Sequence, residues 1–148
     1  MVTATNVTEI TGTLSEIKAV TDAEGDTGDK INLDGDFTAT VSDTGSVAAS
    51  DLTSVSGKTT GNIAATGVTT VTGSATEVAA LIADQADSGD GVNLAANVKA
   101  TITGEAAAAD LNNINNGTTG LVTATGVTKI TGTAAAINTL MGEEGDSG

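Results

Sequence analysis

The chain contains no histidine, cysteine, tryptophan, tyrosine, arginine or proline, and its single aromatic residue is Phe37. The lack of cysteine excludes disulfides and thiolate chemistry, although it does not assign a compartment. Acid–base catalysis is left to aspartate, glutamate or lysine, and the carboxylates lie in glycine-flanked segments that offer no desolvated pocket. Sugar-binding sites usually stack the sugar on aromatic rings, and the only ring here, that of Phe37, is predicted to lie inside. The sequence therefore predicts that the protein is not an enzyme.

Basic residues are also scarce, because five lysines face 19 acidic residues and the formal net charge is −14. Such a charge repels phosphate backbones and anionic lipid surfaces. No apolar run approaches membrane length, and the start has no basic segment followed by an apolar one. We therefore expect no nucleic-acid partner and no membrane insertion, and no export signal is visible.

What the chain does contain is an internal repeat. Residues 4–41 align with residues 65–102 at an offset of 61, and residues 65–89 align with residues 124–148 at an offset of 59. A second version of the pattern starts at Ala39 and again at Ala100. Five units therefore alternate in type as A, B, A, B, A. Their bounds are 1–30, 31–61, 62–91, 92–120 and 121–148.

Each unit combines strand and helix periodicity. In the first B unit, Ile31 and Leu33 alternate with polar residues, a turn follows, and then Phe37, Ala39 and Val41 alternate again. Period two indicates strands with one buried face. Capping-box patterns at Thr13–Glu16 and Ser74–Glu77 predict the starts of short helices. The apolar positions of the predicted helices are Ile17 and Val20; Leu52 and Val55; Val78, Leu81 and Ile82; Leu111 and Ile114; and Ile137, Leu140 and Met141.

A period of roughly 30 residues indicates a repeat architecture, because one such unit cannot bury its apolar face alone. We predict an α/β solenoid of about five stacked coils, each strand, turn, strand, short helix and loop, with parallel strand ladders. The predicted inner ladder is Ile10, Val41, Val71, Ile102 and Ile130, which follow one another at offsets of 31, 30, 31 and 28. Gly12, Gly73, Gly104 and Gly132 are expected at the strand-to-helix turns. A five-bladed propeller is the alternative. Neither end has an obvious polar cap, so we expect end-to-end association and a longer parent array.

Carboxylates gather after each A helix and are missing from the matching B loops. The acidic residues are Asp22, Glu24, Asp26 and Asp29; Asp84, Asp87 and Asp90; and Glu143, Glu144 and Asp146. Several oxygens on a tight, glycine-containing turn are what Ca²⁺ requires. The spacing matches neither the EF-hand loop nor the Gly-Gly-x-Gly-x-Asp nonapeptide. The alternatives are a calcium site and a solvated loop that keeps the protein soluble.

Two further patterns have structural alternatives. Outward neighbours of the predicted ladder form a threonine column, Thr40 with Ser42, Thr70 with Thr72, and Thr101 with Thr103, as in ice-binding solenoids. Glu9 and Lys129 interrupt the column, and threonine is also a good strand former. The Gly-Lys-Thr at residues 57–59 resembles the end of a phosphate-binding loop. It follows a predicted helix rather than a strand, so we interpret it as a turn.

The repeats "TGVTTVTGSATEVAAL" and "ATGVTKITGTAAAINTL", rich in Thr, Ala, Gly and Asp, resemble tandem repeats of very large bacterial surface or secreted proteins. Those of the giant cell-surface proteins of marine cyanobacteria are the nearest in style. The resemblance covers the whole chain and implies an extracellular or cell-surface location. It implies a role as spacer, coat or adhesin stalk whose partners are neighbouring repeats of the same chain.

Overall fold

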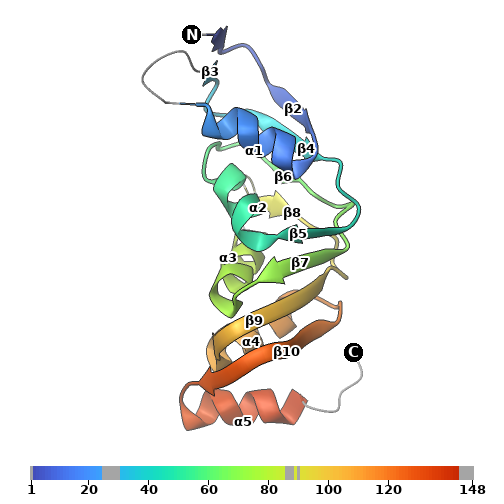
Figure 1. The fold of residues 1–148 in the computed structure, drawn as a ribbon, viewed down its shortest axis with the longest axis vertical. Coiled ribbons are helices and arrows are strands. Elements are labelled where there is room, and N and C mark those ends of the chain that lie inside the picture. The colour runs from blue at the N-terminus through green and yellow to red at the C-terminus, as the bar shows by residue number, and fades with distance from the viewer. Residues whose placement is uncertain (1, 25–30, 86–88, 90, 144–148) are drawn as a thin grey trace.

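The computed structural model describes residues 2–24, 31–85, 89 and 91–143, and this part contains ten strands and five helices (Figure 1). The strands are β1 (Val2–Ala4), β2 (Glu9–Gly12), β3 (Ile31–Leu33), β4 (Thr38–Val41), β5 (Ser46–Ala48), β6 (Ile63–Ala64), β7 (Thr70–Gly73), β8 (Val92–Asn93), β9 (Lys99–Ala107) and β10 (Val122–Thr131). The helices are α1 (Leu14–Asp22), α2 (Ala49–Ser56), α3 (Ala75–Gln85), α4 (Ala108–Gly117) and α5 (Ala134–Glu143).

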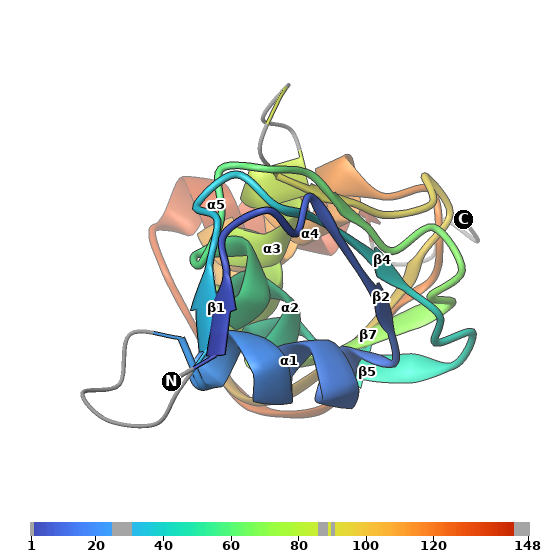
Figure 2. The same cartoon turned by 90° about the horizontal axis from the view of Figure 1, so that it is seen from above.

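The strands form three sheets in which every pairing is parallel. The strand orders are β1-β3, β2-β4-β6-β8 and β5-β7-β9-β10. Each helix packs against the next along the long axis, from α1 to α5 (Figure 1). Seen down that axis, the helices take successive positions around the interior instead of lying directly above one another (Figure 2). The described part of the chain is thus an α/β structure with parallel sheets, which confirms the predicted class.

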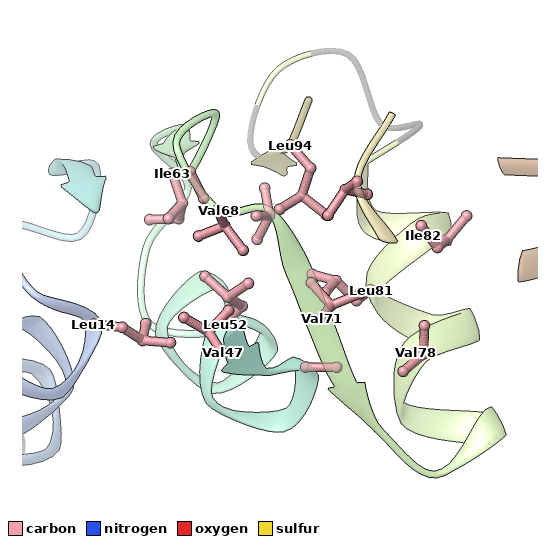
Figure 3. Packing of buried hydrophobic residues seen from close by; sticks show 14 of the residues in the cluster. Leu14, Val47, Leu52, Ile63, Val68, Val71, Val78, Leu81, Ile82 and Leu94 are labelled. Carbon is pink, nitrogen blue, oxygen red and sulfur yellow. The ribbon is translucent and has the colours of Figure 1, made fainter. Parts of the chain in front are cut away.

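The strand and helix patterns place the core correctly in the first four units, but not in α5, where Ile137 and Leu140 are half-buried and Met141 is exposed. The inward positions of the B-unit strands are buried, including the lone aromatic Phe37, which is fully enclosed. Leu52 of α2 and Val78 and Leu81 of α3 are fully buried as well, and they meet Val47 and Val71 from the sheet (Figure 3). One hydrophobic cluster runs from Leu14 to Ile114. Alternation in the strands and three-to-four spacing in the helices were sufficient to find it.

Two of the helices begin with the predicted capping boxes. At α1 the Thr13 amide donates to Glu16 Oε2 at 2.8 Å, and the Glu16 amide donates to Thr13 Oγ1 at 3.3 Å. The same reciprocal pair joins Ser74 and Glu77 before α3, at 2.8 and 3.3 Å. Helices α2 and α4 instead start after Ala48 and Ala107, which make no side-chain cap bond. In the B units the helix begins at the residue directly after the last strand residue, with no loop between them.

That strand was missed in the sequence. The first B unit has a third strand, β5, between β4 and α2, and in the second B unit β9 continues to Ala107. The short stretch Ser46–Ala48 has one buried side chain, Val47, between two less buried neighbours. Three residues give too little alternation to be separated from the helix that follows. The first two A units have two strands each and the third has the single strand β10, whereas the first B unit has three strands and the second has β8 and the long β9.

The predicted ladder of Ile10, Val41, Val71, Ile102 and Ile130 is therefore wrong in register. Val71 lies between Val47 and Ala100, not between Val41 and Ile102. An A unit pairs with the next B unit at an offset of 29, as for Ile63 and Val92. The first B unit pairs with the next A unit at an offset of 24, as for Val47 and Val71, and along β9 and β10 the offset between the second B unit and the third A unit shifts from 22 to 24. The extra strand of the B unit causes this alternation. Ile10 lies opposite Ala39, Val41 opposite Gly12, Ile102 opposite Gly73 and Ile130 opposite Ala106.

The predicted role of the glycines is also partly wrong. Gly104 lies inside β9, not at its end, and has a φ of +85°, a left-handed conformation that favours glycine. The first B unit has the loop between β4 and β5 at the corresponding place, and that loop is longer. This difference accounts for the change of the repeat offset from 61 to 59. Gly12 and Gly73 have no positive φ; they end strands beside the carboxylates of Glu16 and Glu77.

Candidate functional site

The acidic residues that the structure describes lie at the ends of the A helices. Asp22 ends α1 and forms an ion pair of 2.6 Å with Lys18, and the hydrogen bond between them raises the pKa of Lys18. Asp84, in the last turn of α3, accepts a hydrogen bond of 3.2 Å from the amide of Val92 at the start of β8. Glu24 pairs in a single bridge with Ile31. Of these carboxylates, only that of Asp84 connects a helix end to the strand that follows; the Asp22 carboxylate is paired within its own helix, and the bridge of Glu24 is a backbone pairing.

The predicted calcium site falls mainly outside the described residues. Asp26, Asp29, Asp87 and Asp90, together with Glu144 and Asp146, lie in the parts that the structure does not describe. Among the residues that it does describe, no group of three or more histidine, cysteine or carboxylate side chains is arranged to hold a metal ion. Asp22, Glu24 and Asp84 alone do not form a site. Calcium binding therefore stays a prediction.

A polar groove of about 420 Å³ lies where α1 passes over the edge of β5. Ser15, Lys18 and Asp22 of α1 face Ser46 and Asp51 across it. The second repeat has Ala79 and Ala83 where the first has Lys18 and Asp22, so this pairing of charges is not repeated. Thr76 and Asp110 instead bond directly at 3.0 Å across the corresponding step. The additional strand β5 of the first B unit forms one side of this groove. Because its charged residues are not repeated in the second repeat, the groove does not indicate a binding site common to the repeats.

The threonine column expected for ice binding is not formed. Thr72 does lie beside Thr101, but Thr70 lies beside Lys99, and Thr103 lies beside Gly126. Thr40 belongs to the other long sheet, opposite Thr11 and Ala64. The alternating register separates these residues, whereas the predicted column assumed equal steps from unit to unit. Several hydroxyls bond across the strands instead, as where Thr72 donates to the Val47 carbonyl at 3.2 Å.

The Gly-Lys-Thr stretch is a turn, as predicted, and it has a structural role that the sequence did not reveal. Thr59 Oγ1 donates to the carbonyl of Phe37 and accepts from the amide of Gly61 at 2.9 Å. Thr118 repeats both bonds, with the carbonyl of Val98 and, at 2.9 Å, with the amide of Gly120. In the sequence, the only indication of this structural role is the Thr-Thr-Gly that occurs in both B loops. Each of these turns thus joins the C-terminal end of a B helix to the residue just before β4 or β9 of the same unit.

The remaining feature is an apolar groove of about 420 Å³ at the C-terminal end of the molecule. It is formed by side chains from α4, β10 and α5. Its lining residues are Leu111, Asn115, Val122, Ala124, Ile130, Leu140, Met141 and Glu143. Ile130 is 45% exposed and Met141 is 65% exposed, which is unusual for side chains of this size on a core-type pattern.

None of the helices in the described part of the chain is long and apolar enough to span a membrane. Comparisons with models of protein families, with curated protein sequences and with solved structures found nothing that matches this chain.

Proposed function

We propose that this chain is a solenoid of five stacked coils and serves as a non-catalytic spacer module in a large bacterial surface or secreted protein. The coils are the five units of the repeat, and their partners are neighbouring repeats of the same polypeptide. The resemblance of the repeats supports the location and the kind of parent protein, and the pairing of successive units supports the stack.

The observation that carries this proposal is the way successive units pair. Strands of each unit bond to strands of the next, and the helices contact one another in chain order. Side chains from all of the first four units enter one core, among them Leu14, Leu52, Val71 and Ile114. A module of this kind gives its parent protein length and stiffness, and this role requires no reactive site. The net charge of −14 keeps such rods soluble and apart from one another.

Replacing Val71 with Asp tests the stack. Val71 is fully buried between Val47 and Ala100, so a carboxylate there is buried without a partner. We expect a loss of at least about 3 kcal/mol in the free energy of unfolding, measured by circular dichroism in denaturant. Ala80→Asp, on the exposed face of α3, adds the same charge and is the control. Equal stability of the two variants would refute the stack.

A calcium-stabilised extracellular module is the second candidate. Asp22 and Asp84 lie in the last turns of α1 and α3, and no basic residue lies in either turn. The negative end of a helix dipole disfavours carboxylates, and a bound cation would offset that cost. The acids occur after A helices and not in B loops, as expected if the A loops alone take the ion.

Thermal unfolding in excess EDTA, followed by a calcium titration to millimolar concentration, separates the two candidates. Extracellular calcium modules bind in the range of about 10⁻⁴ to 10⁻³ M. For a calcium module we expect the Tm to rise with calcium, and the rise to be abolished by Asp87→Asn with Asp90→Asn. Magnesium at equal concentration controls for ionic strength. An unchanged Tm leaves the spacer without a metal requirement.

A further inference from the structure

The apolar groove at the C-terminal end consists of core positions that no other unit covers within the part of the chain that the structure describes. At the repeat offset of 59, Ile130 corresponds to Val71 and Met141 corresponds to Ile82. Val71 is fully buried and Ile82 is 8% exposed, whereas Ile130 and Met141 are 45% and 65% exposed. The same residue positions are therefore interior in the second A unit and on the surface in the third.

In the second A unit, these positions are covered by a B unit. Strand β8 pairs with β6, β9 pairs with β7, and α4 packs against α3. The first A unit meets the first B unit in the same register, at an offset of 29, as for Ile10 and Ala39. Strand β10 ends its sheet and pairs on one side within the described residues. The groove is thus the continuation of an interface that the molecule forms twice already.

An A unit does not fit this face as well as the second B unit, whose helix ends in a glycine where the first B unit has Lys58. Gly117 ends α4 where the helix crosses Ile82, and a Cβ atom at this position would overlap the Ile82 side chain. The A helices have Ala23, Asp84 and Glu143 at the corresponding position, so each would bring a side chain onto Met141. Both ends of this chain are A units, and a second copy therefore offers the less suitable surface.

We infer that the C-terminal face, formed by β10 and α5, is a docking site for a coil of the B type. The inference rests on the proposed stack and adds a rule to it: A units accept B units on this side, and the order alternates. The occupant has apolar residues at alternate strand positions and a glycine at the end of its helix, as in residues 92–120.

The test adds one coil to the full chain. Gly148 corresponds to Gly89, so a copy of residues 90–120 placed directly after Gly148 reproduces the natural loop. The matched arm carries a copy of residues 61–91, an A coil of equal length. A third arm carries the B copy with Ala100→Asp at its inward strand position. The readouts are the Tm and the rate of Met141 oxidation by hydrogen peroxide, measured by mass spectrometry.

We expect the B extension to raise the Tm by about 5 °C or more and to slow Met141 oxidation at least about fivefold. The A extension and the Ala100→Asp arm should do neither. Equal protection by the A and B copies, or no protection by the B copy, would overturn the inference. A concentration-dependent protection of Met141 in the unextended chain, lost on Ile130→Asp, would identify a second copy as the occupant and overturn it too.

These outcomes are distinct from failure of the proposed stack. If the stack is wrong, Val71→Asp leaves the stability unchanged whatever the extensions do. If the rule of alternation alone is wrong, Val71→Asp still unfolds the chain while the B copy fails to protect Met141.

Discussion

At the residue scale, pairs of side chains in successive units are matched in size. Ile82 of the second A unit lies against Gly117 of the second B unit. At the corresponding positions of the first two units the residues are Thr21 and Lys58, so a smaller A residue goes with a larger B residue. Thr21 is fully buried and its hydroxyl donates to the Lys18 carbonyl at 3.2 Å. Glycine at residue 117 is therefore explained by packing, not by helix propensity.

Gly117→Ala tests this matching. The added Cβ overlaps Ile82, and overpacking of this kind costs about 1 to 3 kcal/mol in the free energy of unfolding. Gly142→Ala is the control, because no atom lies within 4 Å of the position and alanine favours the helix by about 0.5 to 1 kcal/mol there. The two variants should shift the urea midpoint in opposite directions.

A double-mutant cycle assigns the effect to the contact. In an Ile82→Ala background, Gly117→Ala should cost at least about 1 kcal/mol less than in the parent chain. Additive effects of the two substitutions would mean that the loss has another origin.

The sequence predicted which single residues are buried but not what they touch. Phe37, Leu52 and Val78 were identified from periodicity alone, since a period of two or of three to four decides which face is covered. Contacts such as that of Thr59 with Phe37 join residues whose proximity depends on how the helix returns to the sheet. Nothing in the local pattern encodes that return.

At the scale of elements, the capping boxes make the A helices sensitive to acid. Hydrogen bonds from the backbone amide of Ser74, and then from its hydroxyl, lower the pKa of Glu77, and Thr13 lowers the pKa of Glu16 in the same way. A lowered pKa in the folded state contributes stability that is present at neutral pH. It is lost as the pH falls below the usual glutamate value of about 4.3 and through the folded value.

Glu77→Gln should therefore lower the Tm at pH 7, and this effect should diminish as the pH falls through the lowered folded-state pKa of Glu77. Ser74→Ala should cost about 1 kcal/mol at pH 7 through loss of the cap. Asp36→Asn, at an exposed position in the turn before β4, removes the same charge and is the control for the change in net charge. A constant difference between pH 7 and pH 3 for Glu77→Gln would contradict the proposed cause.

The helices and the longer alternating strands were predictable, whereas β5 and the junction inside β9 were not. Capping boxes are local signals, and the structure has them at Thr13 and Ser74 as expected. The β5 strand depends on its neighbour β7 for hydrogen bonds and is very short. Short strands of this type are fixed by pairing with other units and leave little trace in their own sequence.

At the scale of the whole molecule, two spacings must be reconciled. Parallel strands lie about 4.8 Å apart, whereas packed helices need about 8 to 10 Å between their axes. Helices stacked directly above one another at the strand spacing would collide. The helices of this chain instead take successive positions around the long axis (Figure 2). The alternation of the strand pairing between offsets of 29 and 24 goes together with this displacement.

The repeat unit of the structure is consequently a pair of units, in keeping with the predicted alternation of A and B units. The anchor residues follow one another at offsets of 28 to 31, and this near equality suggested equal register steps from each coil to the next. The longer offsets of 61 and 59 already contained the true period. The register within the pair depends on the number of strands in each unit. The number of strands could not be determined from the sequence, because the three-residue strand β5 was not recognised there. The acidic residues after α1 and α3 follow the same period of two units.

Insertions test this pairing in the interior of the chain. A copy of residues 92–120 followed by a copy of residues 62–91, inserted after residue 91, adds one B and one A unit and preserves both the alternation and the contact of Ile82 with a glycine. A copy of residues 62–91 at the same place puts an A unit on an A unit. We expect the paired insertion to unfold in one transition with a larger m-value, because more surface is exposed on unfolding. In X-ray scattering its longest dimension should grow by about 10 Å or more, which is two strand spacings.

The single insertion should behave differently, although it is shorter and has the same type of composition. Its extra helix meets Ile82 with a side chain where Gly117 now passes, and its strands meet partners of the wrong register. We expect a lower Tm than that of the parent chain and an unfolding transition that splits in two. If one added unit is tolerated as well as two, successive units are interchangeable. The alternation of register would then be a consequence of drift in the repeats instead of a requirement of the stack.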